Sequence, residues 1–281
     1  MHEFELLQSI YKKASQSSAI QIGPGDDMGE LQIGNERVLC AVDQLIVGRH
    51  VTPETPPELI GRKAIARCFS DIAAMGATPV GSLLTACLPP EVTSSWCNEV
   101  FLGAKEVAER WGGPIFGGDI ATSDGQTVFT VTAIASPGCK TLLRTGAQVD
   151  DYLCVTGELG NSIAGHHLSF TPRIKEAQEL VQILGDDLHS MIDISDGLGQ
   201  DAYHLTMDNV QIVIDPELLP LRDGATIHGA INDGEDYELL FTSAIEPPKH
   251  LATVIGRVQR GEKSVVTTDG KDISNCGWVH E

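Results

Sequence analysis

The chain has 281 residues and a mass of 30.1 kDa, enough for two domains of ordinary size or one large one. Its 39 acidic and 19 basic side chains leave a net charge of −20, which argues against a binder of nucleic acid or of an anionic membrane, because clustered basic residues hold those partners. With 42% hydrophobic and 21% charged residues, the chain is expected to fold rather than to stay disordered.

The first half of the chain predicts helices that alternate with strands. Pro56, Pro57 and Glu58 are typical of the first turn of a helix, and Gly76 is typical of its end. Helices are expected over 3–13, 55–76 and 92–111, and strands over 37–47, 80–88 and 127–135.

The second half repeats this alternation. Helices are expected after Gly160, from Pro172 and after Gly197, and strands over 151–156, into Asp193, and near 210–214, 237–242 and 253–258. A joint is expected near residues 136–146. We therefore predict an α+β (α/β layered) fold with two domains: residues 1–137 around a mixed sheet, and residues 138–281 as an α/β sandwich-like domain.

The cysteines and the apolar segments indicate the compartment. Seven cysteines form no C-x-x-C pair and are odd in number, which excludes the usual zinc spacings and a disulfide framework and favours a reducing environment. No segment approaches the ~20 apolar residues that span a bilayer, and the acidic N-terminus lacks the features of a secretory signal. A cytoplasmic protein is expected.

Acidic residues recur in short glycine-rich turns or beside apolar strands. Asp71 is the most informative, because residues 64–77 are almost wholly apolar and an ionised carboxylate there needs a cation, hydrogen-bond donors or a raised pKa. For any single acid, a helix cap or a hydrogen-bonded turn is the simpler explanation. Five such settings together favour convergence in the fold; their acids are Asp26, Asp27, Asp43, Asp71, Asp119, Asp193 and Asp196.

Carboxylates without a matching set of His and Cys are typical ligands of hard cations such as Mg²⁺. Residues 193–197 lack the rest of an EF-hand loop, and residues 256–264 miss the spacing of a phosphate-binding P-loop at Glu262. A protein-kinase catalytic loop and a G-x-S-x-G elbow are also missing from the sequence. Converging carboxylates would instead neutralise nucleotide phosphates through Mg²⁺ and stabilise a transferred phosphoryl group.

Several blocks of the sequence resemble thiamine-monophosphate kinases, which belong to the superfamily of aminoimidazole-ribonucleotide synthetase. Two of them are specific: Ser-Asp-Ile-Ala-Ala-Met-Gly-Ala at 70–77 and Gly-Glu-Asp-Tyr-Glu-Leu at 234–239. The remaining blocks cover the chain in order at 25–27, 41–50, 117–119, 155–160, 171–173, 192–198, 255–256 and 277–280.

The resemblance implies ATP-dependent phosphorylation of thiamine monophosphate to thiamine diphosphate by direct in-line transfer, assisted by several Mg²⁺ ions. It also implies a homodimer built across the N-terminal sheets, an N-terminal domain that binds ATP and Mg²⁺, and a C-terminal domain that completes the active site. The implied metal ligands are Asp27, Asp43, Asp71, Asp119, Asp193 and Asp196; the implied ATP contacts are Gly117, Gly118, Arg144 and Ser195; and the implied substrate contacts are His50, Glu235 and Trp278.

These implied roles agree with the chemistry of a cationic heterocycle and of phosphoryl transfer. An indole such as Trp278 can stack on a flat cationic heterocycle, and Glu235 adds charge complementarity. No further catalytic group is assigned, because the attacking phosphate oxygen is already ionised and positioning with metal charge suffices. Each residue also has an ordinary structural explanation: a packed His50 or Trp278, an exposed Arg144, or a turn acid at Glu235.

The chain departs from the family pattern around the substrate. Ala41 and Val42 replace the hydroxyl residues expected before Asp43, which removes one side-chain metal ligand, and Asp233 replaces a glycine. The segments at 165–172 and 223–233 are short. Two alternatives stay open: a degenerate paralogue that binds nucleotide or metal without catalysis, and a sister ATP-dependent enzyme that acts on another small phosphorylated substrate.

Overall fold

The computed structural model describes residues 3–14 and 17–278. The first half contains α1 (Glu3–Tyr11), β1 (Ile20–Ile22), β2 (Gly29–Ile33), β3 (Glu36–Ile46), α2 (Pro57–Ala74), β4 (Thr78–Leu88), α3 (Ser94–Arg110), β5 (Ile115–Thr122) and β6 (Val128–Ser136). The second half contains β7 (Tyr152–Val155), α4 (His166–Ser169), α5 (Ile174–Leu184), β8 (Leu188–Asp193), α6 (Leu198–Leu205), β9 (Val210–Ile214), α7 (Ile227–Asn232), β10 (Leu239–Ser243), β11 (Thr253–Arg260) and β12 (Ser264–Thr267), with short 3₁₀ turns η1 (Ser162–Ala164), η2 (Gly185–Asp187) and η3 (Pro216–Leu218).

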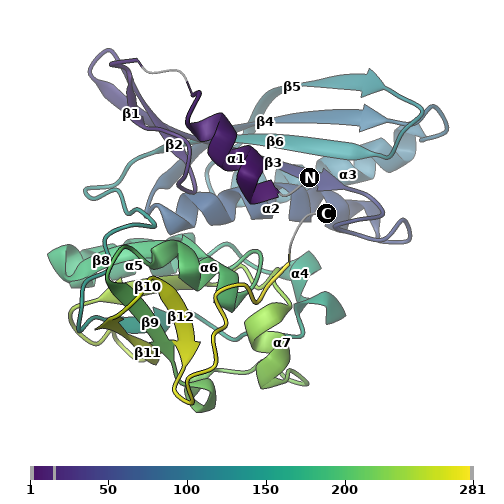
Figure 1. The fold of residues 1–281 in the computed structure, drawn as a ribbon. Helices are drawn as coiled ribbons and strands as arrows, with labels where there is room; N and C mark the ends of the chain where they lie inside the picture. The colour runs from purple at the N-terminus through teal and green to yellow at the C-terminus, as the bar shows by residue number, and fades with distance from the viewer. Residues whose placement is uncertain (1–2, 15–16, 279–281) are drawn as a thin grey trace.

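The strands form two mixed sheets, one in each half of the chain. The first sheet has the order β1-β2-β3-β6-β4-β5, and the second has the order β12-β9-β11-β7-β10-β8. Each contains one parallel pair, β4 with β5 and β12 with β9, among antiparallel pairs. Figure 1 shows the two sheets in separate layers. The predicted α+β class with a two-domain layout is confirmed.

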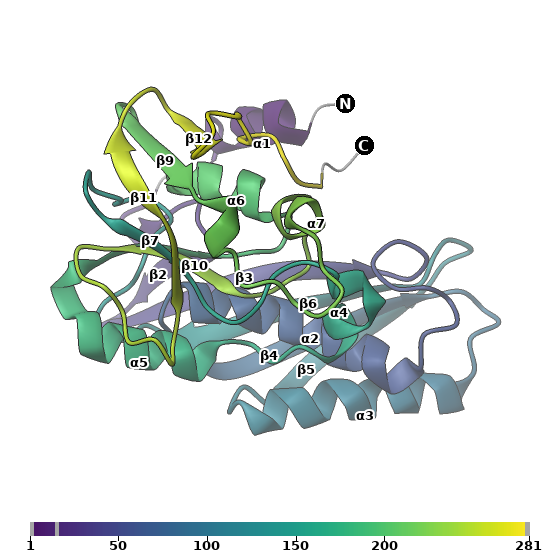
Figure 2. The same cartoon turned by 90° about the horizontal axis from the view of Figure 1, so that it is seen from below.

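Helix α2 is the central element of the molecule. It packs against α3 and the first sheet on one side and contacts α4, α5 and β8 of the second half on the other (Figure 2). The close approach of α2 and α3 depends on two glycines, because a Cβ on Gly61 would lie 1.8 Å from the Val100 carbonyl oxygen and one on Gly103 would lie 1.9 Å from that of Glu58. One buried apolar cluster runs from the first sheet through α2 to α5, and the two halves are thereby joined.

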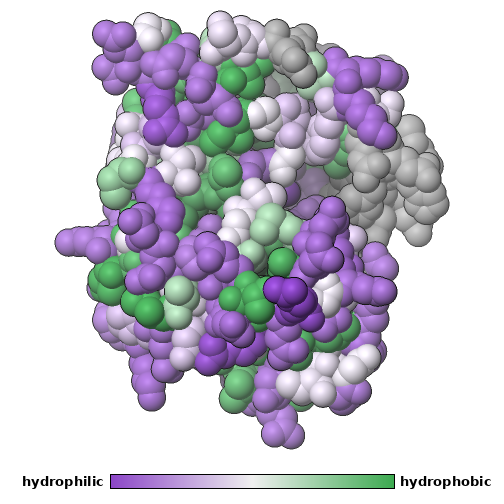
Figure 3. All heavy atoms as spheres, turned by 60° about the vertical axis from the view of Figure 1, so that its left-hand side comes forward, coloured by the Kyte–Doolittle hydropathy of each residue, from purple (hydrophilic) through white to green (hydrophobic). Residues whose placement is uncertain are grey.

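The face of the first sheet that points away from α2 carries exposed apolar side chains. In the second half, a separate apolar cluster fills the space between the sheet and α6. Hydrophilic side chains predominate on the face seen in Figure 3, in keeping with the acid excess. No helix in the described part of the chain is long and apolar enough to cross a membrane. The exposed apolar residues on the face of the first sheet that points away from α2 include Leu31, Ile33, Val42, Val80 and Phe116.

The sequence predicted most elements to within a few residues, but it did not predict β5, and the grouping of residues 117–119 with the short glycine-rich turns was wrong. They lie in the middle of β5. A Cβ on Gly118 would lie 1.8 Å from the Leu84 carbonyl oxygen of the neighbouring strand. The glycine therefore permits a close approach between two strands rather than a change of direction.

Candidate active site

Helix α2 carries three charged residues on one face, at its contact with the second half. Lys63, Arg67 and Asp71 are spaced four residues apart, so their side chains follow one another at about 6 Å along the helix axis. Lys63 is fully buried. Because most other buried positions of α2 are apolar, each of these charges needs a partner from elsewhere in the fold.

Asp27, Asp71 and Asp193 form a cluster of carboxylates, in which one oxygen of each lies within 4.8 Å of the others. They come from the loop between β1 and β2, from α2 and from the end of β8. Burial and the charge of Asp193 raise the pKa of Asp71 well above its usual range, and burial and Asp27 raise the pKa of Asp193 to about 7. The cluster therefore favours an added proton or cation.

The cluster fits a divalent metal ion. Asp27 Oδ2 is buried and has no hydrogen-bond partner within residues 3–14 and 17–278. Arg144 engages the other oxygen, since its Nη2 lies 2.8 Å from Asp27 Oδ1, while its backbone N–H donates to Asp26 at 3.1 Å. Arg144 thus orients Asp27 and leaves its second oxygen for a cation, and carboxylate oxygens are what Mg²⁺ prefers.

A cleft of about 330 Å³ opens between the two halves of the chain. Ser195 and Asp196 line the cleft two and three residues after Asp193, so the cleft adjoins the carboxylate cluster. The first half contributes Asp43, Arg49, His50 and Arg67, and the second half contributes Ile163, Ser195, Asp196, Asp233, Glu235, Tyr237 and Trp278. The structure therefore brings together six residues that the sequence singles out: Asp43, His50, Ser195, Asp196, Glu235 and Trp278.

Glu235 is held by a buried network beneath the cleft. Lys63 Nζ donates to both of its carboxylate oxygens at 2.8 Å, and His167 Nδ1 lies 3.2 Å from one of them. Burial alone would raise the pKa of Glu235, but the hydrogen bond from His167 and the charge of Lys63 lower it to about 2. Burial lowers the pKa of Lys63 to about 8 against the attraction of Glu235. The carboxylate is thus ionised and fixed in place.

The turn between β8 and α6 organises the second-half side of the cleft. Asp201 is buried, and its Oδ2 accepts hydrogen bonds of 3.0 Å from the backbone N–H groups of Asp196 and Gly197. The backbone N–H of Glu235 donates to the Ser195 carbonyl at 2.8 Å, and that of Trp278 donates to the Asp196 carbonyl at 2.7 Å. Three separate segments are therefore tied to one turn.

Three predicted metal ligands lie outside the cluster: Asp196, which lines the cleft, and Asp43 and Asp119. Asp43 faces α2, where both of its oxygens contact Arg67. Asp119 is exposed on β5, at the far edge of the first sheet. Asp119 pairs with Thr85, which pairs with Thr130, which in turn pairs with Gln44. Because side chains alternate along a strand, Asp119 lies on the opposite face of the sheet from Asp43.

The sequence did not indicate several residues that shape this site. Lys63, Arg67, His167 and Tyr237 all contact predicted site residues or line the cleft. A signal for Lys63 and Arg67 was present, because they precede Asp71 at steps of four residues within an apolar helix. His167 had no such signal, since its role depends on a contact between distant segments.

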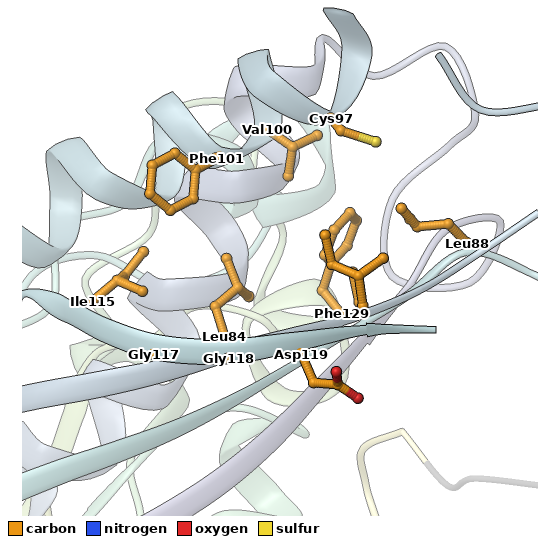
Figure 4. A pocket seen from close by; sticks show the side chains of 12 residues that line it. Leu84, Leu88, Cys97, Val100, Phe101, Ile115, Gly117, Gly118, Asp119 and Phe129 are labelled. Carbon is orange, nitrogen blue, oxygen red and sulfur yellow. The ribbon is translucent and has the colours of Figure 1, made fainter. Parts of the chain in front are cut away.

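A second cavity, of about 590 Å³, lies between the edge of the first sheet and α3. Figure 4 shows Leu84, Val100, Phe101 and Ile115 pointing into this space. Gly117 and Gly118 form part of its wall, whereas the side chain of Asp119 points away from it. The cavity is therefore an apolar slot with exposed strand backbone on one side.

This chain is similar to known proteins in sequence and in structure. The family "AIR synthase related protein, N-terminal domain" matches residues 25–136. Thiamine-monophosphate kinase of Rhodopirellula baltica is 32% identical over 99% of this chain and 97% of its own length, and that of Aquifex aeolicus is 33% identical over the same shares. The solved structure of AaThiL complexed with AMPPCP and TMP superposes with a TM-score of 0.87 at 30% identity, over 100% of this chain and 97% of that chain.

Proposed function

The chain belongs to the thiamine-monophosphate kinase family, and we propose that it transfers the γ-phosphoryl group of ATP directly to the phosphate of thiamine monophosphate, which gives thiamine diphosphate. One observation carries this proposal: the carboxylate cluster of Asp27, Asp71 and Asp193 adjoins a cleft that ends at an ionised Glu235. A site of this kind suits a substrate with phosphate at one end and a cation at the other.

The cleft is proposed to bind thiamine monophosphate with its rings toward Glu235 and Trp278. Trp278 is half exposed at the rim, where its indole can stack on a cationic ring. The charge of Glu235 complements that of the thiazolium, and His50 lines the same wall. The phosphate then extends toward the carboxylate cluster, and the acceptor oxygen needs no base because it is already ionised.

The cavity beside α3 is proposed to bind the adenine of ATP. Its apolar walls suit a flat base, and the backbone at Gly117 and Gly118 allows close approach of the nucleotide. Arg144 and Ser195 lie beside the carboxylate cluster, where they would contact the phosphates.

Replacing Phe101 with alanine tests the adenine cavity. We expect KM for ATP to rise about tenfold, because the truncation removes one apolar wall, while KM for thiamine monophosphate stays within about twofold. Steady-state kinetics with each substrate varied in turn measure both values. Leu102→Ala, at the exposed neighbouring position, is the control. Equal changes in both KM values would contradict this placement of the base.

Asp27, Asp71 and Asp193 are proposed to hold Mg²⁺, with Asp196 close by to assist a further ion. When bound, Mg²⁺ supplies positive charge that neutralises the phosphates during transfer. The protein's own part is to hold three carboxylates at one point and to keep Asp27 oriented through Arg144.

Metal binding at this cluster is expected to depend on pH. The pKa of Asp193 is about 7 in the folded protein and near 3.8 in an unfolded chain, so its contribution to the stability of the metal-free protein is present below about pH 4 and is lost as the pH rises through 7. Mg²⁺ replaces the proton. Its addition should therefore raise Tm more at about pH 8 than at about pH 6. Differential scanning calorimetry of wild-type and Asp193→Asn proteins measures the difference, which the substitution should abolish.

A homodimer across the first sheets is proposed to complete the metal site. Asp119 lies three strand spacings, about 14 Å, from Gln44, the residue next to Asp43, and its side chain is on the face of the sheet opposite to that of Asp43, away from the cleft of its own chain. The exposed apolar residues of that face, Val42, Val80 and Phe116 among them, suit contact with a second copy. Such a contact would bring Asp119 to the site of the other subunit.

Mixing two inactive variants tests this arrangement. Asp119→Ala and Asp71→Asn subunits that exchange should form heterodimers with one intact site, and the mixture should recover about one quarter of wild-type activity. Activity that stays at the level of the separate variants would contradict a shared site. Size-exclusion chromatography with light scattering confirms that both variants remain dimers.

Two further measurements test whether the chain catalyses phosphoryl transfer or only binds nucleotide. Calorimetric titration with a non-hydrolysable ATP analogue and Mg²⁺ measures nucleotide binding, and a turnover assay measures transfer. Binding with turnover supports the kinase, whereas binding without turnover supports the degenerate paralogue.

We also propose a cytoplasmic location, which is supported by seven cysteines that are all free.

A further inference from the structure

Arg67 stands in the middle of the charged face of α2 and is clamped to Asp43. Its Nε lies 3.0 Å from Asp43 Oδ2, and its Nη2 donates to Asp43 Oδ1 at 3.1 Å. Its Nη1 donates to the Gln44 carbonyl at 2.9 Å. Two contacts to one carboxylate and one to the adjacent backbone fix the plane of the guanidinium.

The position of Arg67 along α2 relates it to both ends of the cleft. Lys63, one turn earlier, holds Glu235, and Asp71, one turn later, belongs to the carboxylate cluster. Arg67 lines the cleft between these two points, about 6 Å along the helix axis from each. The rings of the substrate are proposed to lie toward Glu235, and the metal-bound phosphates toward Asp71. The phosphoryl group that is transferred between them would then lie beside Arg67.

The guanidinium is charged and still has donors to offer. An arginine guanidinium stays protonated in proteins, and the carboxylate of Asp43 lies beside this one. In the described part of the chain, the hydrogen bonds of Arg67 use one N–H on each terminal nitrogen. Each of those nitrogens therefore keeps a second N–H for a phosphate oxygen.

We propose that Arg67 is a catalytic residue of this chain, which contacts the transferred phosphoryl group through its guanidinium while Asp43 serves as its anchor. The proposal rests on the kinase function proposed above. In the transfer, the bond from the γ-phosphorus to the ADP oxygen breaks and a bond to the phosphate oxygen of thiamine monophosphate forms. Arg67 keeps its proton throughout and stabilises the negative charge on the three equatorial oxygens.

A purely structural ion pair is the competing explanation, and the two make different predictions. Arg67→Met should reduce kcat by about a hundredfold to a thousandfold, with KM for both substrates changed by less than about threefold. Asp43→Asn keeps the guanidinium and one carbonyl acceptor for it, so its kcat should fall about tenfold or less. A structural pair would instead give both variants similar losses, because each breaks the same contact.

Two measurements distinguish the explanations without relying on turnover of the substituted enzyme alone. Binding of ADP with aluminium fluoride and thiamine monophosphate, which mimics the transferred phosphoryl group, should weaken about a hundredfold in Arg67→Met, while binding of AMPPCP stays within about threefold. Added guanidinium at non-denaturing concentration should restore part of the kcat of Arg67→Ala, and sodium at the same ionic strength should not. Calorimetric Tm values establish that the variants are folded.

The outcomes separate this proposal from the kinase proposal. If the wild-type protein forms no thiamine diphosphate, the kinase function fails. If the wild-type protein turns over but Arg67→Met loses less than about tenfold in kcat, or loses AMPPCP binding as strongly as it loses binding of the fluoride complex, the role of Arg67 is overturned. A selective loss of kcat and of fluoride-complex binding, with rescue by guanidinium, supports it.

Discussion

Replacement of Asp71 by asparagine is expected to reduce kcat by at least about a thousandfold, the largest effect of any single substitution at this site. Asp71 shares the cluster with Asp27 and Asp193, and asparagine has the same shape but lacks the charge that holds a cation. Steady-state production of thiamine diphosphate measures the loss. Asp208→Asn, which removes an equally charged but exposed carboxylate, is the control and should retain wild-type activity.

The same substitution is expected to leave the metal-free fold unchanged or more stable. Burial and the neighbouring carboxylates raise the pKa of Asp71 well above its usual value, so its ionised form opposes folding. Thermal unfolding of the metal-free protein at about pH 8 should therefore give an equal or higher Tm in Asp71→Asn. A lower Tm together with a modest loss of kcat would contradict the assignment, because it would indicate a structural carboxylate instead of a metal ligand.

Replacement of Glu235 by glutamine is expected to raise KM for thiamine monophosphate by about ten- to a hundredfold, with a smaller effect on KM for ATP. The change removes the negative charge proposed to face the cationic rings. It also leaves Lys63, which is fully buried, without its charged partner. Breaking a buried ion pair from one side costs about 3–5 kcal/mol, so a lower Tm is expected as well.

A matched set of variants separates the effect on recognition of thiamine monophosphate from the effect on the stability of the fold. Glu217→Gln alters an exposed acid and should change neither KM nor Tm. Lys63→Met removes the other member of the pair, so it should lower Tm similarly but leave the carboxylate of Glu235 facing the cleft. An unchanged KM for thiamine monophosphate in Glu235→Gln would contradict the proposed orientation of the substrate. A similar rise in KM in both variants would assign the effect to the loss of the pair.

The sequence predicted the elements that carry the site because their patterns are local. The prolines at 56 and 57 with Glu58, and Gly76 at the other end, predicted α2, and the segment around Asp193 and Gly197 predicted a strand followed by a helix. These motifs placed Asp27, Asp71 and Asp193 among the metal candidates, and the fold brings their oxygens together.

The parts that the sequence could not predict depend on pairing between distant segments. The face on which Asp119 lies depends on alternation along β5 and on an irregular register between Ser82 and Leu83 of β4, and neither is visible in the residues 117–119 themselves. The partner of Arg67 depends on where β3 passes α2. A glycine pair likewise does not distinguish a turn from a close approach of two strands, which is why β5 was missed.

This chain is a thiamine-monophosphate kinase if it transfers a phosphoryl group from ATP to thiamine monophosphate. The most direct test incubates the purified protein with Mg²⁺, thiamine monophosphate and ATP labelled with a heavy isotope of oxygen in the γ-phosphoryl group, and identifies the products by mass spectrometry. We expect equal amounts of ADP and thiamine diphosphate, with the label on the terminal phosphoryl group of the latter. Bound nucleotide without any labelled thiamine diphosphate would contradict the account.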